Sequence, residues 1–371
     1  MDFSLNEFQS MLTDSVGKFV DNEYSFEKRQ ANADSERGYG VDTWQNFCEL
    51  GWTALPFDEA DGGIDGGPIE TMLLMQQFGR GLVVEPYLAN IVLAGGVIRR
   101  LGNAAQKEKW LGPLIEGELQ AALAIAEPHN RYEYAEIKTT AVRDGDDWVL
   151  NGSKSVVFNG GNADLLLIPA VTDSNGAGLS IFAVAADSPG LSRKAFGTVD
   201  GSSAADISLE NVRVSEDALL GEAGQGLATL ESVVDDAILA VSAEAVGIMQ
   251  ALTDKTVEYC KNRVQFGVPI GSFQALQHRM VDMLTASEQS YSLLLWATMA
   301  NADATEEAKQ SIHAIKYQIG TAGKLVGQEA IQLHGGMGMS WEFDVGHYFK
   351  RLTVIGQILG NADWHLEELI E

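Results

Sequence analysis

The spacing of apolar residues changes twice along this chain of 371 residues. Up to about Leu119 apolar residues recur at the 3.6-residue spacing of helices, with a Gly- and Asp-rich break at 57–68 that we predict to be a loop. Between Ala121 and Gly221, short apolar or alternating runs separated by turn signals predict antiparallel strands. From Leu227 the helical spacing returns. The sequence therefore predicts an α+β fold that is mostly helical.

This order of elements suggests three domains. We expect an N-terminal helical domain at 1–119, a middle antiparallel β domain at 120–225 and a C-terminal helical bundle at 226–371. Strands and helices do not alternate, which argues against a doubly wound nucleotide-binding fold. A nucleotide-type cofactor would therefore need another kind of site.

Composition excludes several classes of function. The chain has 25 Lys+Arg against 52 Asp+Glu, a formal net charge of −27, so we expect neither nucleic acid nor an anionic membrane surface as a partner. Its two cysteines, Cys48 and Cys260, and the lack of clustered His, Cys and Asp predict neither a disulfide framework nor a metal site. No apolar run reaches the length of a membrane span, and no secretory leader precedes the first helix. A cytoplasmic protein fits these features.

Two segments interrupt the C-terminal helical region and could bind a phosphate group. Segment 263–274 places Arg263 before a loop rich in Gly and Pro, and a guanidinium suits phosphate in bidentate geometry. The simpler interpretation is a turn between helices with a surface arginine. Segment 332–339 contains a Gly cluster whose backbone N–H groups could approach a pyrophosphate, although a helix C-cap is the commoner explanation for such glycines.

With these segments in place, the whole sequence resembles the acyl-CoA dehydrogenase family. The motifs that carry the resemblance are Arg263-x-x-Phe266-Gly267-x-Pro269-Ile270-Gly271-x-Phe273-Gln274, Gln332-x-His334-Gly335-Gly336-x-Gly338, Asn151-Gly152-x-Lys154 with Asn159-Gly160-Gly161, and Ile207-x-Leu209-x-x-Val212-x-Val214 leading to Leu219-Leu220-Gly221. The resemblance implies that the C-terminal domain is a four-helix bundle. Two stretches, 257–283 and 345–353, are similar to the small subunits of pimeloyl-CoA dehydrogenases.

The resemblance also implies an activity, a cofactor and partners. We expect FAD-dependent α,β-dehydrogenation of an acyl-CoA with a bulky or dicarboxylic acyl group, with electrons passed to an electron-transferring flavoprotein. FAD would lie at a subunit interface of a homodimer, a homotetramer or an α2β2 complex with a related subunit. Its implied binding residues are Arg263 at the pyrophosphate, Gln265, Phe266, Phe273 and Leu276, together with Gln332, Gly335 and Gly336 from the neighbouring subunit.

The sequence departs from the family at the catalytic base. The usual Glu near the start of the last helix aligns with Gly360, and a second known position aligns with Ala237. Asp235 and Asp236 are its close neighbours, and we predict Asp236, with Asp235 as second choice, to be the base that removes the α-proton. Glu244 is expected to be a structural partner for a buried polar group.

The β domain departs as well. The usual Gly-rich loop near the flavin is replaced by residues 127–133, Glu-Pro-His-Asn-Arg-Tyr-Glu, and the aromatic residue that often stacks on the flavin ring by Val156, with Phe158 at the following hydroxyl position. Arg131 is expected to form a surface salt bridge or, as the alternative, to bind an acidic acyl tail or the CoA phosphates.

Three readings of function remain open at this point. The first is a self-sufficient dehydrogenase. The second is a non-catalytic small subunit of an α2β2 complex, in which the partner chain supplies the base. The third keeps the fold but oxidises a substrate that lacks CoA.

Overall fold

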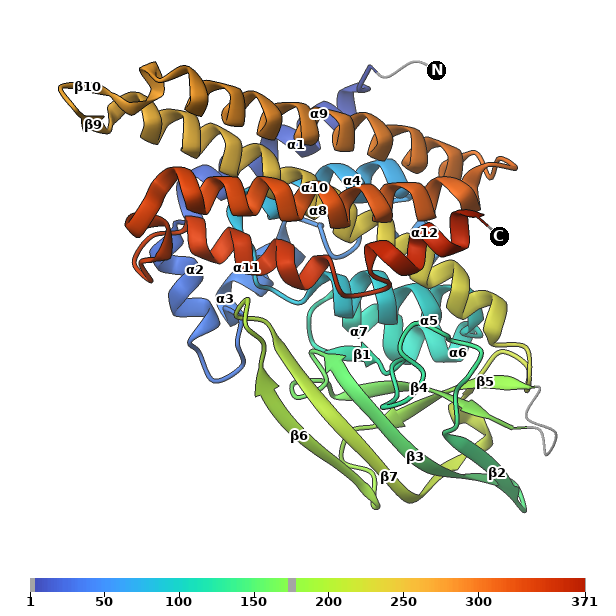
Figure 1. Cartoon of the computed structure of the whole chain (residues 1–371). Helices are drawn as coiled ribbons and strands as arrows, with labels where there is room; N and C mark the ends of the chain where they lie inside the picture. Colours follow the sequence, from blue (N-terminus) through green and yellow to red (C-terminus); the bar gives the residue numbers. More distant parts are fainter. Residues whose placement is uncertain (1–3, 173–177, 371) are drawn as a thin grey trace. The chain divides into compact units, whose positions relative to one another are not determined.

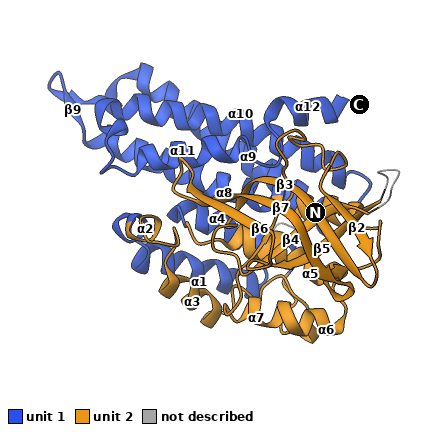
Figure 2. Cartoon of the chain, turned by 90° about the horizontal axis from the view of Figure 1, so that it is seen from below, with its two compact units in different colours: residues 1–30, 67–83, 238–371 blue, residues 31–66, 84–237 orange. Residues whose placement is uncertain are grey.

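The computed structural model describes residues 4–172 and 178–370. Figure 2 colours the two compact units into which the chain divides. Unit 1 comprises residues 1–30, 67–83 and 238–371, and unit 2 comprises residues 31–66 and 84–237. The predicted division into three domains at 119/120 and 225/226 stays a prediction.

The N-terminal region is helical, as predicted. Helix α1 (Glu7–Glu23) begins at a capping box in which Asn6 and Gln9 bond each other's backbone N–H, and it packs on α4 (Pro68–Gly81). The predicted loop at 57–68 contains one 3₁₀ turn and ends where Pro68 opens α4. The remaining helical segments are α2 (Phe26–Ala33), α3 (Val41–Glu49), η1 (Glu59–Asp61), η2 (Leu88–Gly95), α5 (Gly96–Leu101), α6 (Ala104–Gln106), η3 (Lys107–Leu111) and α7 (Gly112–Ile115).

The middle region is one sheet in unit 2, visible in green in Figure 1. Its strands are β1 (Ala121–Leu123), β2 (Thr140–Asp144), β3 (Asp147–Phe158), β4 (Leu165–Val171), β5 (Leu179–Ala185), β6 (Leu191–Gly197), β7 (Ser203–Ser215) and β8 (Leu219–Leu220). They follow the order β6-β7-β3-β2-β4-β5-β8, with β1 beside β4. All pairs are antiparallel except β1 with β4 and a single β2–β4 position, which are parallel. The predicted β region is confirmed, with these two parallel pairs as an addition.

The C-terminal region is the predicted helical bundle. Helix α8 (Leu227–Asn262) begins at the predicted residue, and the chain continues through the segments β9 (Val264–Gln265), β10 (Val268–Pro269), η5 (Ile270–Ser272), α9 (Gln274–Ala302), α10 (Ala308–His334), η6 (Gly335–Met339), α11 (Val345–Ile355) and α12 (Ala362–Ile370). Within unit 1, α9, α11 and α12 all pack on α10 (Figure 1). Helix α10 is therefore the common packing partner of these three helices.

Glycines on one face of α10 allow this packing. A Cβ added at Gly320 would lie 2.9 Å from the Cβ of Ala362 on α12, and one at Gly327 would lie 2.7 Å from the Phe349 ring on α11. These distances are shorter than ordinary van der Waals contact, so α11 and α12 approach α10 as closely as they do only because side chains are missing there.

No helix within the described ranges is long and apolar enough to cross a membrane. The same residues contain no group of three or more His, Cys, Asp or Glu side chains placed to hold a metal ion.

Candidate functional site

The segment after α8 forms a tight hairpin whose tip is strained and exposed. Strands β9 and β10 are joined by Phe266 (φ 55°) and Gly267 (φ 83°), which is the left-handed pair of a two-residue hairpin turn. Gly takes this conformation freely, but an aromatic residue rarely does. The Phe266 side chain is 92% exposed, and its ring meets that of Phe273 edge-on at 6.2 Å. An exposed aromatic in a strained conformation indicates a binding function.

Arg263 lies at the base of this hairpin and offers an uncommitted positive charge. Its backbone is fixed, because its N–H donates to Tyr259 O and its carbonyl accepts from Ile270 N, both at 2.8 Å. Its side chain is exposed and makes neither a hydrogen bond nor an ion pair with any residue in the described parts of the chain. In a chain with a net charge of −27, a guanidinium left without a carboxylate is available to an external anion. Of the other predicted residues, Gln265 is exposed and Leu276 is half-buried.

The predicted glycine turn follows α10 directly. Gly335 (φ 60°) ends the helix by donating its N–H to the carbonyls of Gln332 and Ile331, so the C-cap interpretation is correct. Gly335 and Gly336 are also exposed, and a Cβ at either position would have no atom within 4 Å. The same turn therefore presents open backbone that a ligand can approach.

Tyr259 connects these two predicted segments. Its ring stacks on His334 with the centroids 4.4 Å apart, and its hydroxyl donates to His334 O at 3.3 Å. Because His334 Nδ1 lies 2.8 Å from the carbonyl of Ala330, which can only accept, Nδ1 carries a proton. Burial lowers the pKa of His334, so the ring is neutral near pH 7. The hairpin and the glycine turn thus lie at the same end of the bundle, and Tyr259 is a residue that motif reasoning missed (Figure 1).

The candidate catalytic aspartates lie on the first part of α8, in unit 2. Asp236 accepts a hydrogen bond from Arg100 on α5, with Nη2 and Oδ2 2.6 Å apart, and its side chain is 25% exposed. Its other oxygen, Oδ1, has no hydrogen-bond partner in the described ranges. Asp235 is half-buried near Tyr134, whose pKa is raised by burial and further by the negative charge of Asp235. Ala237, which the resemblance aligns with a second base position, is fully buried.

Gly360 occupies the corner between α11 and α12 and cannot be replaced without strain. Its φ is +103°, in the region that favours glycine. A Cβ there would lie 2.2 Å from His365 Nε2 and 2.7 Å from the Trp364 ring. The corner therefore has no room for a side chain at the position where the resemblance predicts a catalytic carboxylate.

Glu244 is paired as expected. Its two carboxylate oxygens accept from Arg351 Nε at 2.5 Å and Nη2 at 2.7 Å, and the side chains are 5% and 14% exposed. This bidentate geometry confirms the structural role predicted for Glu244.

A buried ion pair holds the loop that replaces the family's Gly-rich segment. Glu127 accepts hydrogen bonds from Lys154 Nζ at 2.7 Å, from Thr139 Oγ1 at 2.6 Å and from the backbone of Lys138 at 2.8 Å. Burial opposes the charge on Glu127, but Lys154 and the hydrogen bonds outweigh it and lower its pKa. Lys154 also donates to Pro169 O at 2.8 Å, which ties the loop to β4. The Asn-Gly-x-Lys motif thus supplies the cation that fixes both ends of loop 127–139.

Two residues of the β region stand in strained, exposed positions. Arg131 (φ 44°) is exposed and forms no ion pair with any described residue, so the expected surface salt bridge is wrong. Val156 (φ 50°) is 45% exposed at a bulge of β3, where its N–H donates to Asp206 Oδ1 at 3.1 Å. A β-branched residue in the left-handed region is an outlier that indicates function or strain. Phe158 ends β3 opposite Ala204.

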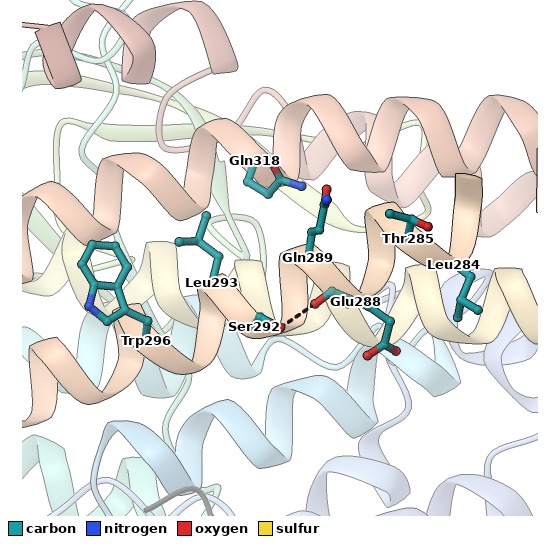
Figure 3. Close-up of a pocket in the computed structure, with 8 residues that line it drawn as sticks. All are labelled: Leu284, Thr285, Glu288, Gln289, Ser292, Leu293, Trp296 and Gln318. Atoms are coloured by element: carbon teal, nitrogen blue, oxygen red, sulfur yellow. Dashed lines mark hydrogen bonds between the residues drawn. The ribbon is translucent and has the colours of Figure 1, made fainter. Parts of the chain in front are cut away.

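A groove with a volume of about 770 Å³ lies between α9 and α10 in unit 1. Figure 3 shows its lining residues. It is lined by Leu284, Thr285, Glu288, Gln289, Ser292, Leu293, Trp296 and Gln318. No sequence-predicted site residue lines it, and Glu288 is its one ionisable lining residue. The groove is therefore separate from the candidate cofactor and base residues.

Comparison with known proteins shows one family over nearly the whole chain. Family models match at residues 6–118 (acyl-CoA dehydrogenase, N-terminal domain), 122–212 (middle domain) and 224–371 (C-terminal domain). A probable acyl-CoA dehydrogenase of Bacillus subtilis, YngJ, is 31% identical over 368 residues, covering 96% of each chain. Two solved structures that align over 100% of this chain and 98% of theirs are the ChsE4-ChsE5 complex from Mycobacterium tuberculosis (TM-score 0.91, 26% identity) and an FAD complex of PigA (TM-score 0.92, 26% identity).

Proposed function

Since this chain belongs to the acyl-CoA dehydrogenase family of FAD-dependent oxidoreductases, we propose that it catalyses α,β-dehydrogenation of an acyl-CoA thioester. In this reaction the α-carbon loses a proton to a base, and the β-carbon loses a hydride. Bound FAD would supply the acceptor for this hydride, and we propose an electron-transferring flavoprotein as the acceptor of the electrons. We propose a bulky or dicarboxylic acyl group for the substrate. We also propose a cytoplasmic location for the protein.

The observation that carries this proposal is the end of the bundle in unit 1. Arg263 has a fixed backbone and an unpaired guanidinium, which fits a pyrophosphate. The exposed Phe266 ring and its neighbour Phe273 provide an apolar surface for the adenine. Gly335 and Gly336 provide backbone that a dinucleotide from a neighbouring subunit can approach, because no atom lies where a Cβ would be. These residues fit FAD.

Asp236 is the proposed base. Arg100 engages Oδ2 and orients the carboxylate, and Oδ1 remains able to receive a proton. The enolate that develops on the thioester needs hydrogen-bond donors in place before the reaction.

A second candidate function is the non-catalytic small subunit of an α2β2 acyl-CoA dehydrogenase. The observation that favours it is Gly360, because the corner between α11 and α12 excludes a side chain at the usual base position. In this alternative the chain contributes half of a shared FAD site and the partner supplies the base. The similarity of 257–283 and 345–353 to pimeloyl-CoA dehydrogenase small subunits agrees with it, as does the solved complex of two named chains.

Arg131 is the residue through which we propose that the acyl group or CoA is recognised. Its guanidinium is exposed and lacks a carboxylate in the described ranges, and the neighbouring Asn130 is held by its Oδ1, which accepts from Glu127 N at 2.9 Å. An unpaired guanidinium suits the free carboxylate of a dicarboxylic acyl chain or a CoA phosphate.

The deciding experiment is the visible spectrum of the purified chain before and after anaerobic addition of acyl-CoA esters. The panel includes butyryl-CoA, pimeloyl-CoA and a branched ester, and flavin is quantified per chain. One flavin per chain that bleaches with an ester supports the self-sufficient dehydrogenase. A chain that is colourless, or coloured without bleaching, supports the small-subunit alternative if a related chain restores bleaching. Flavin reduction that occurs only with substrates lacking CoA would overturn both candidate functions.

A further inference from the structure

Two buried basic side chains on α10 face the corner between α11 and α12. His313 and Lys316 are 7% and 0% exposed, and they continue the α10 face that carries Gly320, because positions three and four apart lie on one side of a helix. This cluster belongs entirely to unit 1 and contains none of the predicted cofactor or base residues. His365 on α12 is its third member and is 0% exposed.

The hydrogen bonds of the two histidines assign their protons. His365 Nε2 lies 2.9 Å from Leu359 O, and a carbonyl can only accept, so Nε2 carries the proton. Burial lowers the pKa of His365 to about 3, so the ring is neutral and Nδ1 has a free lone pair. His313 Nδ1 lies 3.0 Å from that atom and must therefore donate to it. The result is one directed chain of donors from His313 through His365 to the backbone of the corner.

Lys316 holds the same corner from α10. Its Nζ donates to Ile355 O at 2.9 Å and to Gly360 O at 2.6 Å. Ile355 is the last residue of α11, so its carbonyl is one of those that a helix leaves without a backbone partner. Within the described ranges Nζ has no carboxylate partner. A buried amino group that donates to two carbonyls of one corner serves to fix that corner.

The two sets of bonds leave no space at position 360. His365 Nε2, held at Leu359 O, stands 2.2 Å from the position of a Cβ on Gly360. Lys316 holds the Gly360 carbonyl, so residue 360 cannot turn away from the ring without losing that bond.

We propose that His365 and Lys316 form a lock on the α11–α12 corner that restricts position 360 to glycine and so prevents this chain from carrying the base at the family's usual place. His365 and Lys316 are positioning residues, since they act through the backbone of residues 359 and 360. The meaning of the lock for catalysis rests on the proposed function, but the lock itself is tested without substrate.

The test is a double-mutant cycle on thermal unfolding of the purified full chain with the flavin it carries. Gly360→Ala adds a Cβ, and His365→Ala removes the ring that the Cβ would meet. The strain of φ +103° and the contact with the half-buried Trp364 are present in both backgrounds and cancel. We expect the fall in Tm caused by Gly360→Ala to be at least halved when His365 is Ala. Gly356→Ala, in the same corner at φ −64°, is the matched control, and its effect should not depend on His365.

A second readout follows the protons and separates a lock from simple packing. In ¹⁵N-histidine-labelled protein, we expect His365 protonated at Nε2 and His313 at Nδ1, with the His313 resonance shifted by His365→Gln. Lys316→Met should speed amide hydrogen exchange across 356–361 without changing exchange at the glycine turn 335–339.

Additive costs in the cycle, or the opposite tautomers, would overturn the lock. If the single variant Gly360→Ala fails to fold, recovery of folding in the double variant supports the lock. If the double variant also fails to fold, the histidine tautomers of the wild-type chain decide the question. A failure of flavin reduction leaves these results unaffected, so the lock and the proposed function fail separately.

Discussion

Arg263 is the residue on which cofactor binding is expected to depend most. Its guanidinium is exposed and unpaired in the described parts of the chain, so Arg263→Ala removes the contact to pyrophosphate without breaking an internal bond. A charge-assisted hydrogen bond contributes about 1.5–3 kcal/mol, so FAD should bind at least tenfold more weakly. The ratio of flavin absorbance to protein absorbance after gel filtration measures the loss of FAD. Lys261→Ala, which changes a cation already paired with Glu258 nearby, is the control and should retain FAD.

Asp236 is expected to act through its free oxygen. Asp236→Asn keeps the shape of the side chain and removes the proton acceptor, so anaerobic flavin reduction by an acyl-CoA should slow by about 10²-fold or more with FAD retained. Asp254→Asn, an exposed change on the same helix, should leave the rate unchanged. Reduction of the Asp236 variant at the parental rate would remove this residue from the reaction.

At the residue scale the sequence predicts the positions whose role depends on local geometry. Arg263 and the Gly335-Gly336 turn stand out in it because a cation before a Gly-Pro loop and glycines after a helix are local patterns, while their role in binding FAD stays a prediction. The Tyr259–His334 contact and the His313–His365 contact are not visible, because their partners lie 75 and 52 positions apart. Only the folded chain brings such pairs together.

Among the elements, α10 buries a lysine whose titration should be measurable. Burial lowers the pKa of Lys316 from 10.5 to about 7. Between these values the unfolded chain binds a proton that the folded chain releases, so the free energy of unfolding rises with pH across this window and is flat outside it. The rise is on the order of a few kcal/mol. Lys316→Met should lack it in urea unfolding from pH 7 to 10, whereas Lys324→Met, on the exposed face of α10, should retain it.

Loop 127–139 should depend on its buried ion pair. Lys154→Met leaves the Glu127 carboxylate buried without its cation and should cost about 3–5 kcal/mol in urea unfolding at pH 7. The double variant with Glu127→Gln should recover a large part of this loss. Lys138→Met is the control, because the exposed Lys138 contacts Glu127 through its backbone N–H. A loss equal to that of the control would contradict the role of the pair.

At the element scale, the spacing of apolar residues predicts the helices and strands that the local sequence determines. The strands from β3 to β7 and the start of α8 at Leu227 follow from apolar spacing and turn residues. The bonds that fix the corner between α11 and α12 do not follow from periodicity, because Lys316 on α10 donates to Gly360 O and His365 on α12 donates to Leu359 O. The hairpin at Phe266 is likewise hidden, since a left-handed aromatic runs against propensity.

For the whole molecule, the charge of −27 should make stability depend on salt. Like charges repel across a compact chain, and ions screen them over about 10 Å at 0.1 M. We expect Tm to rise when NaCl is increased from about 10 to 150 mM, at constant pH and flavin content. An unchanged Tm would contradict this expectation.

The fold of the whole molecule was predictable, but the identity of its acyl group was not. Fold class follows from the order helices, strands, helices. The width and depth of an acyl site depend on how helices from distant parts of the sequence pack, and no local pattern encodes that. The catalytic base was predictable only in part. The sequence has no carboxylate at positions 360 and 237, but no local pattern distinguishes Asp236 from a base on another chain.

The corner at Gly360 also has a consequence for engineering this chain. A carboxylate introduced at position 360 by one substitution meets the His365 ring, and removing the ring alone breaks a bond that holds the corner together. Each single change is therefore disfavoured, and the two have to be made together. An engineered base is easier to introduce at an open position of this chain than at this corner.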